Sequence, residues 1–215
     1  NITLGNNSDG EPCYVIGGAG DYGLWFRHKR AYGYVYESDS GVSWKPSSSR
    51  YYIPERNGDK VKAVMGTLTN YEAIFNAEYS GSASADDNPI DPCSLVYTGD
   101  PKVKWRTPNY RELNTLVKSA EWVTTFSGEK GVLCTSGLFL RCAGGRNGGN
   151  TNSSIRGTES SGGPMALYWT SDVIPGSTGF NTKKAYGTRM VYGNAITVND
   201  VIMNTANSVR CVRDI

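Results

Sequence analysis

Hydrophobic and polar positions alternate with a period of two in the stretch AYGYVYES, near the start of the chain. Tyr32, Tyr34 and Tyr36 would lie on one face of a strand, because successive side chains of a strand point to opposite faces. The polar stretch SDSGVSWKPSSSR that follows reads as a loop. Residues 1–65 are therefore expected to be rich in β-structure.

Two later stretches carry helix signals. In LTNYEAIFNAEY, Thr69 and Glu72 have the spacing of a capping box, which predicts a helix of about ten residues. In WRTPNYRELNTLVKSAEW, Thr107 suits the N-cap and Pro108 the first helical position, where a missing N–H does no harm. The apolar face of this second helix would comprise Tyr110, Leu113, Leu116 and Val117.

Short strands are expected again after the second helix. GVLCTS and GLFLRC flank a Ser-Gly turn and predict a hairpin. AYGTRMVY and AITV are joined by Gly193-Asn194, a pair that suits a type II′ turn. The order of strands, then helices, then strands favours an α+β fold over a parallel βαβ sheet.

Composition narrows the class of protein. The 26 glycines, with many Asn and Ser, indicate long loops and tight turns rather than a helical bundle. Lys and Arg total 22 against 20 Asp and Glu, and this near balance gives no reason to expect a nucleic-acid partner. No apolar stretch approaches the roughly 18–20 residues that span a bilayer, so no transmembrane segment is expected in this chain.

The five cysteines form no CxxC pair and no zinc pattern with the single histidine. A structural zinc site would need four of the five thiols, and their spacing does not suggest one. Disulfides in an oxidising compartment are the favoured interpretation.

Enzyme motifs are absent from the sequence. His28 is the only histidine, so a Ser-His-Asp or Cys-His site would have to use it. It lies in FRHKR, which favours a surface residue in a basic strand or loop. The basic cluster itself is expected to be a solvated face, with a sulfated glycan or an anionic surface as the less favoured alternative.

An acidic cluster precedes Cys93. Asp86, Asp87, Asn88 and Asp91 offer hard oxygen ligands of the kind that hold Ca²⁺. Their spacing is not that of an EF-hand, so turn and capping roles are favoured and no cofactor is expected.

Five short motifs occur in an order that resembles a known family. Along the chain they are DPC, WRTPNYREL, GLFLRCAGGRNG, YWTSD and SVRCVRD. This order resembles the Fibrobacter succinogenes major paralogous domain, over about residues 66–215. The last motif, Ser208 to Asp214, fits over seven consecutive residues. Thr107-Pro108 departs from the family's Leu-Pro-Thr.

The family looks like a relative of the C-type lectin-like fold and of the sulfatase-modifying-factor group. The resemblance therefore implies an α+β, C-type lectin-like domain with two helices and short antiparallel strands over residues 66–215. Residues 1–65 would be a β-rich N-terminal elaboration packed on the same domain. By analogy with C-type lectin-like folds, Cys93 would bond to Cys211. The family positions of Trp105 and Trp169 imply core residues.

Two of the other three cysteines, Cys134 and Cys142, look like additions to the family pattern. Cys134 and Cys142 are expected to bond across their hairpin, because the turn between them is short enough for the two to face each other. Cys13 is then left over. It is either a buried free thiol or a partner for a region outside this chain.

The resemblance also carries a functional expectation. The family is common in surface and secreted proteins of Bacteroidetes-type bacteria, and its usual inferred role is binding or adhesion. The chain is therefore expected to be an extracellular or cell-surface bacterial domain, without catalysis, that recognises a glycan or protein on a host or neighbouring cell. Two alternatives are a ligand-free structural module of a larger envelope or fimbrial protein, and an enzyme on a sulfatase-modifying-factor-like scaffold.

The recognition face is expected in the loops before the last strand, since this end of C-type lectin-like folds commonly binds ligand. Tyrosine, asparagine and serine together suit adaptable recognition surfaces. The candidate ligand-binding residues are Arg146, Asn147, Asn150, Asn152, Tyr186, Tyr192, Asn194, Asn199, Asp200 and Asn204.

Overall fold

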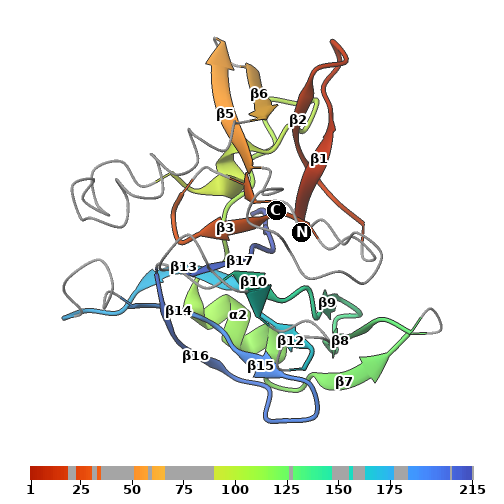
Figure 1. Ribbon diagram of the computed structural model, residues 1–215, viewed down its shortest axis with the longest axis vertical. Coiled ribbons are helices and arrows are strands. Elements are labelled where there is room, and N and C mark those ends of the chain that lie inside the picture. Colours follow the sequence, from red (N-terminus) through yellow and green to blue (C-terminus); the bar gives the residue numbers. More distant parts are fainter. Residues whose placement is uncertain are drawn as a thin grey trace.

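The computed structural model is built mostly of short β-strands (Figure 1). In the part of the chain that it describes, α2 (Tyr110–Val117) is the one α-helix, and η2 (Pro92–Leu95) is a short 3-10 helix. The expected two-helix, C-type lectin-like α+β fold is therefore wrong. The helix expected from LTNYEAIFNAEY lies outside the described residues. These are 1–18, 23–30, 33–34, 51–57, 60–65, 90–125, 128–146, 155–156, 163–176, 184–203 and 205–214.

The N-terminal part begins with a hairpin and continues into the largest sheet. In the hairpin, β1 (Ile2–Asn6) pairs with β2 (Pro12–Ile16), and Leu4 lies opposite Tyr14. The large sheet has the strand order β11-β10-β17-β3-β4-β5-β6. In that order, its strands are β11 (Ile155–Arg156), β10 (Gly145–Arg146), β17 (Ala206–Ser208), β3 (Trp25–Arg27), β4 (Gly33–Tyr34), β5 (Tyr51–Asn57) and β6 (Lys60–Met65).

The large sheet joins the two ends of the chain. Strand β3 pairs antiparallel with β17, so that Trp25 lies opposite Ser208 and Arg27 opposite Ala206. Figure 1 shows β3 and β17 side by side near the middle of the molecule. Strands β3 to β6 of the N-terminal part therefore share a sheet with β17, β10 and β11 from the C-terminal half.

Three smaller sheets make up the rest of the C-terminal half. The hairpin expected around the Ser-Gly turn is confirmed, because Val132 lies opposite Leu140 and Gly137 takes a positive φ in the turn. The strands of the first sheet are β7 (Glu121–Thr124), β8 (Lys130–Leu133) and β9 (Phe139–Arg141). Those of the other two are β12 (Met165–Ala166) with β15 (Met190–Val191), and β13 (Trp169–Val173) with β14 (Lys184–Thr188) and β16 (Val198–Ile202).

The hairpin expected around Gly193-Asn194 does not form. Strand β14 pairs with β16, whereas β15 pairs with β12, so the two strands on either side of this turn belong to different sheets. The turn runs from Val191 to Asn194, whose N–H donates to the Val191 carbonyl at 2.9 Å. Gly193 has φ +83° in the third position, which matches type II and not type II′.

Helix α2 confirms the expected apolar face but begins later than predicted. Its N-cap is Asn109, not Thr107, and Asn109 forms a reciprocal capping box with Glu112. The Glu112 N–H donates to the Asn109 side chain at 2.9 Å, and the Asn109 N–H donates to Glu112 Oε2 at 2.8 Å. In this box, side-chain oxygens accept from the N–H groups of both Asn109 and Glu112. Leu113 and Val117 are buried.

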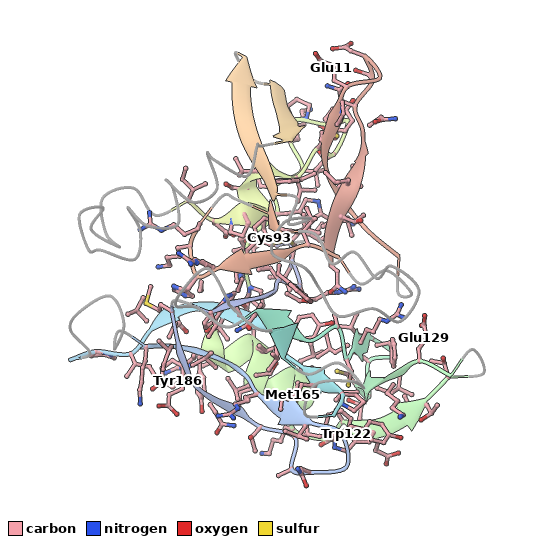
Figure 2. All side chains as sticks on the ribbon, viewed as in Figure 1. Glu11, Cys93, Trp122, Glu129, Met165 and Tyr186 are labelled. Carbon is pink, nitrogen blue, oxygen red and sulfur yellow. A yellow bond between two sulfur atoms is a disulfide. The ribbon has the colours of Figure 1, made fainter. Side chains whose placement is uncertain are left out.

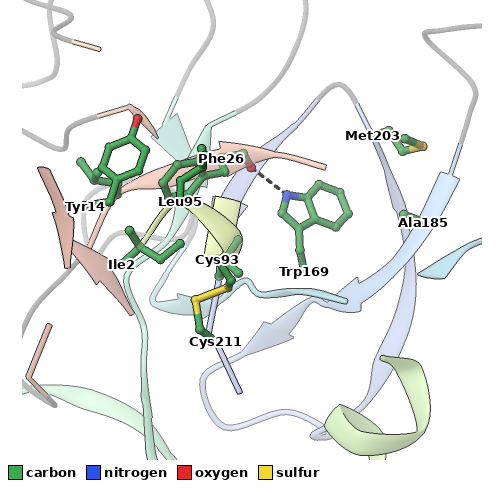
Figure 3. Packing of buried hydrophobic residues seen from close by; sticks show 11 residues of the cluster. Ile2, Tyr14, Phe26, Cys93, Leu95, Trp169, Ala185, Met203 and Cys211 are labelled. Atoms are coloured by element: carbon green, nitrogen blue, oxygen red, sulfur yellow. Dashed lines mark hydrogen bonds between the residues drawn. A yellow bond between two sulfur atoms is a disulfide. The ribbon is translucent and has the colours of Figure 1, made fainter. Parts of the chain in front are cut away.

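Two hydrophobic clusters hold the fold together. The first joins the β1–β2 hairpin and β3 to η2 and the end of the chain, around Phe26, Trp169 and the Cys93–Cys211 pair (Figure 3). The second joins α2 to the β7–β9 sheet and to β12 and β15. Trp169 is a core residue, as expected, whereas Trp105 is only partly buried and packs against the first cluster.

Candidate functional site

The motif segments that are far apart in the sequence meet at one place. Cys93, in η2, forms a disulfide with Cys211, 118 residues later, with an S–S distance of 2.06 Å (Figure 3). This confirms the expected pairing. Both sulfur-bearing residues are buried in the first hydrophobic cluster, so the bond fastens the end of the chain to its core.

Asp91 connects η2 to the segment that leads into α2. Its Oδ1 accepts from the Cys93 N–H at 2.9 Å and from Thr107 Oγ1 at 2.6 Å, and its Oδ2 accepts from the Thr107 N–H at 2.8 Å. Asp91 therefore has the capping role that was favoured over calcium binding. Asp86 and Asp87 lie outside the described residues. Within the described ranges, no group of three or more His, Cys, Asp or Glu residues is placed to hold a metal ion.

Arg106 links the chain's end to the start of α2. Its guanidinium donates to both oxygens of Glu112 at 2.7 Å and to Asp214 Oδ1 at 2.7 Å. Its backbone also pairs with Val212 through two hydrogen bonds of 2.9 Å. The hydrogen bonds from Arg106 lower the pKa of Glu112 to about 2, and those to Asp214 lower its pKa as well.

The YWTSD motif is tied to the same region. The indole Nε1 of Trp169 donates to the Phe26 carbonyl at 2.8 Å (Figure 3), and the carboxylate of Asp172 accepts from the Tyr110 N–H at 2.7 Å. The Ser171 N–H donates to the Pro108 carbonyl at 2.8 Å. The motif residues that carry the family resemblance are thus engaged in holding the scaffold.

His28 is buried, so its expected surface position is wrong. Only 3% of the residue is exposed, and its Nε2 lies 2.9 Å from the Thr170 carbonyl oxygen. Because a carbonyl only accepts, Nε2 carries the proton. The ring also packs edge-on against Trp169, with centroids 5.3 Å apart. His28 lies directly after β3, and its burial follows from its contacts with Thr170 and Trp169 of β13, a non-local arrangement that the basic stretch FRHKR does not indicate.

The expected Cys134–Cys142 disulfide is wrong, and both residues are buried free thiols. The reason is the register of the β8–β9 hairpin. The Cys134 N–H bonds to Leu138, whereas the Cys142 N–H bonds to Lys130, so the two cysteines lie on either side of the Val132–Leu140 pair. Four residues of strand separate their positions by about 13 Å, well beyond the reach of a disulfide. Cys13 is also a buried free thiol.

The candidate recognition residues that the structure describes do not form one patch. Tyr186 and Asp200 lie opposite each other on β14 and β16, where Tyr186 packs on Tyr110 of α2 with ring centroids 4.5 Å apart. Asp200 is exposed and pairs with Lys184. Asn199 is one residue away from Asp200 and therefore points to the other face of the sheet.

Tyr192 and Asn194 belong to a different surface. Figure 2 shows Tyr186 and Trp122 toward opposite sides of the lower half of the molecule. Tyr192 packs edge-on against Trp122, with ring centroids 5.2 Å apart, and the Trp122 indole N–H donates to the Asn194 carbonyl at 2.6 Å.

The Tyr192 ring is fixed from two further sides. Its hydroxyl lies 2.8 Å from Thr124 Oγ1, and the Lys130 ammonium lies 5.5 Å from the ring centroid. Thr124 and Lys130 are themselves cross-strand neighbours on β7 and β8. We call this surface the aromatic ledge; it consists of Trp122, Thr124, Lys130, Tyr192 and Asn194.

The structure does not place the side chains of the remaining candidate residues. Asn147, Asn150, Asn152 and Asn204 lie outside the described residues. The backbone of Arg146 lies in β10 between β11 and β17.

Sequence reasoning missed Trp122, Thr124 and Lys130. The signal was the stretch EWVT, in which Trp122 and Thr124 share one face of a strand and Val123 lies on the other. Nothing in the local sequence pattern indicates that Tyr192, 70 residues later, contacts this strand.

Comparison with known proteins adds no relative: no family model matches the chain, and neither a curated protein nor a solved structure matches it. Among the described residues, no helix is long and apolar enough to cross a membrane.

Proposed function

We propose that this chain is an extracellular or cell-surface binding domain that recognises a glycan or a protein through the aromatic ledge. The observation that carries the proposal is the position of Tyr192, whose ring is fixed by Trp122, Thr124 and Lys130. A ring that is already ordered loses little conformational freedom when a ligand packs on it. The exposed Asn194 at its edge adds an amide suited to hydrogen bonding with sugars or peptides.

Two further points support this proposal. The Cys93–Cys211 disulfide suits an oxidising compartment. The motif order resembles a bacterial domain family that is common in surface and secreted proteins and has an inferred binding role.

A screen of immobilised glycans and cell-surface proteins with the purified chain tests the proposal. Tyr192→Ala should weaken binding of any ligand found by about tenfold or more, as loss of a central aromatic anchor does. Tyr192→Phe keeps the ring and should keep most of the affinity. Asn199→Ala is the matched control, since Asn199 is exposed but lies on the β14–β16 sheet. Equal affinity of the Tyr192→Ala and Asn199→Ala variants would contradict the ledge as the site.

A second function is favoured by a different observation. The motif residues Asp91, Arg106 and Trp169 are all engaged in interactions that hold the scaffold. A ligand-free structural module of a larger envelope protein would need only these. Failure of the screen to find any ligand would favour this second function over the first.

A further inference from the structure

A cavity of about 680 Å³ is formed by η2 and the loop that follows it, and it is lined by residues 93–101 and 103–105. Its volume lies within the usual range of ligand sites, about 300–1,000 Å³. The lining shares no residue with the aromatic ledge. Figure 2 shows Cys93, at one end of this segment, near the middle of the molecule and Trp122, of the ledge, at its lower edge. The cavity is therefore a separate site.

The loop around the cavity is ordered by its own hydrogen bonds and by the N-terminal hairpin. The Tyr97 N–H donates to the Tyr14 carbonyl of β2 at 2.7 Å. Within the loop, the Asp100 carbonyl accepts from the Thr98 hydroxyl at 2.6 Å, and Asp100 Oδ1 accepts from the Lys102 N–H at 2.9 Å. A wall that is already ordered loses little conformational freedom when a ligand binds to it.

Three polar groups at the cavity have room for a further partner. In the described part of the chain, the Asp100 carboxylate forms no ion pair and accepts only the hydrogen bond from Lys102. Among the same residues, the exposed Lys104 pairs with no carboxylate, and the indole N–H of Trp105 donates to no acceptor. The Arg213 guanidinium lies 5.8 Å from the centre of the Trp105 ring and outside the lining, so it supports the ring without filling the cavity.

These groups fit a neutral ligand that both donates and accepts hydrogen bonds. A carboxylate only accepts, whereas an ammonium group and an indole N–H only donate. The two charged lining residues, Asp100 and Lys104, have opposite signs, so the lining favours a ligand without net charge. The rings of Tyr97 and Trp105 add apolar surface beside them. A sugar ring combines these properties, because hydroxyls surround its edge and C–H groups cover its face.

We propose that this cavity binds a neutral hexopyranose unit of a carbohydrate. The Asp100 carboxylate accepts from sugar hydroxyls, and the Lys104 ammonium and the Trp105 indole N–H donate to others. The C–H face of the sugar packs against the aromatic part of the wall. This site goes beyond the function proposed for the aromatic ledge and does not depend on it.

Titration of the whole ¹⁵N-labelled chain with the methyl glycosides of glucose, galactose and mannose tests the proposal. At least one of them should bind with a Kd on the order of 1 mM, as the size of such a ligand implies, and should shift the indole N–H signal of Trp105. The uronates of the same three sugars carry a negative charge and should bind more weakly. No shift of the Trp105 signal with any neutral glycoside at tens of millimolar, or tighter binding of a uronate, would overturn the proposal.

Variants locate the site. Asp100→Asn and Lys104→Met should each weaken binding about tenfold, as the loss of a charge-assisted hydrogen bond does. Lys102→Met is the matched control, because Lys102 lies in the same loop, is exposed and does not line the cavity. A thermal melt of each variant reports its folding, and the titration of the wild-type chain stands without any variant. Wild-type affinity in both Asp100→Asn and Lys104→Met would contradict the proposal.

A variant of the aromatic ledge separates this proposal from the function proposed for the ledge. Tyr192→Ala should keep the wild-type affinity for the glycoside, because Tyr192 does not line the cavity. Loss of glycoside binding in Tyr192→Ala would place the sugar on the ledge and contradict the cavity as its site.

Discussion

Arg106 contacts Asp214 across 108 residues of chain, with a guanidinium nitrogen 2.7 Å from a carboxylate oxygen. The same nitrogen lies 2.7 Å from Glu112, the residue that completes the capping box of α2. Arg106 therefore joins the start of α2 to the end of the chain, and the Cys93–Cys211 disulfide joins η2 to the same end.

Glu112→Gln should lower the free energy of unfolding at pH 7 by less than about 1 kcal/mol, because the Arg106–Glu112 pair is partly exposed and screened by solvent. The amide keeps the shape needed for the capping box. The pKa of Glu112 is about 2 in the folded chain, against an ordinary 4.5, so its carboxylate stabilises the fold above about pH 4.5. The difference from wild type should shrink as the pH falls from 4.5 toward 2.

Urea denaturation at several pH values measures this difference. Glu121→Gln, an exposed change on β7, is the control and should show little effect at any pH. A Glu112→Gln difference that grows on acidification would contradict the ion pair.

The Cys93→Ser/Cys211→Ser variant should be less stable by about 4–5 kcal/mol in the chain-entropy model, since the disulfide closes a loop of more than 100 residues. Urea unfolding of the wild-type chain with and without reductant measures the same quantity. Reductant should leave the double variant unchanged. Equal unfolding midpoints for the wild-type chain and the double variant would show that the bond does not constrain the fold.

Alkylation of the unfolded, unreduced chain should label three free thiols. Cys13, Cys134 and Cys142 are buried, and burial raises the pKa of each, to about 12 for Cys142. The native chain should therefore resist iodoacetamide, whereas the chain unfolded without reductant should take up three labels by mass spectrometry. Uptake of a single label would mean that Cys134 and Cys142 are bonded after all.

Asp91→Ala should lower the free energy of unfolding by about 3 kcal/mol, because it leaves the N–H groups of Cys93 and Thr107 without their acceptor. Asp100→Ala is the control: Asp100 is also an aspartate that accepts a backbone N–H, but it is exposed. Calcium should not change the melting temperature of the wild-type chain. A rise of the melting temperature with calcium would contradict the capping role and indicate that Asp91 binds a metal ion. An unchanged free energy of unfolding in Asp91→Ala would also contradict the capping role.

Local sequence signals predicted local structure well. The apolar face of α2, with Leu113 and Val117, was visible as a periodic pattern, and the β8–β9 hairpin was visible from the Ser-Gly turn between two short stretches. The start of α2 was misplaced, because Thr107 and Asn109 both have capping side chains and only the reciprocal bond to Glu112 decides between them. The Cys93–Cys211 bond came from a family resemblance and not from spacing.

The pairing of strands that lie far apart in the chain could not be predicted from local sequence patterns. The turn at Gly193 looked like a hairpin, but β14 takes β16 as its partner and β15 takes β12. His28 looked exposed because its neighbours are basic, although its ring packs against Trp169 and bonds to the Thr170 carbonyl of β13. The aromatic ledge depends on Tyr192 reaching Trp122, which no local pattern encodes.

The indole N–H signals of the five tryptophans offer the most direct test of the ledge as a recognition surface. In ¹H–¹⁵N NMR, a ligand found by the screen should shift the Trp122 signal, because the Trp122 ring packs against Tyr192 and its N–H bonds to the Asn194 carbonyl. The signal of Trp169, which is buried and bonded to the Phe26 carbonyl, should stay in place. A ligand that binds while the Trp122 signal remains unchanged would contradict the proposed function of the ledge.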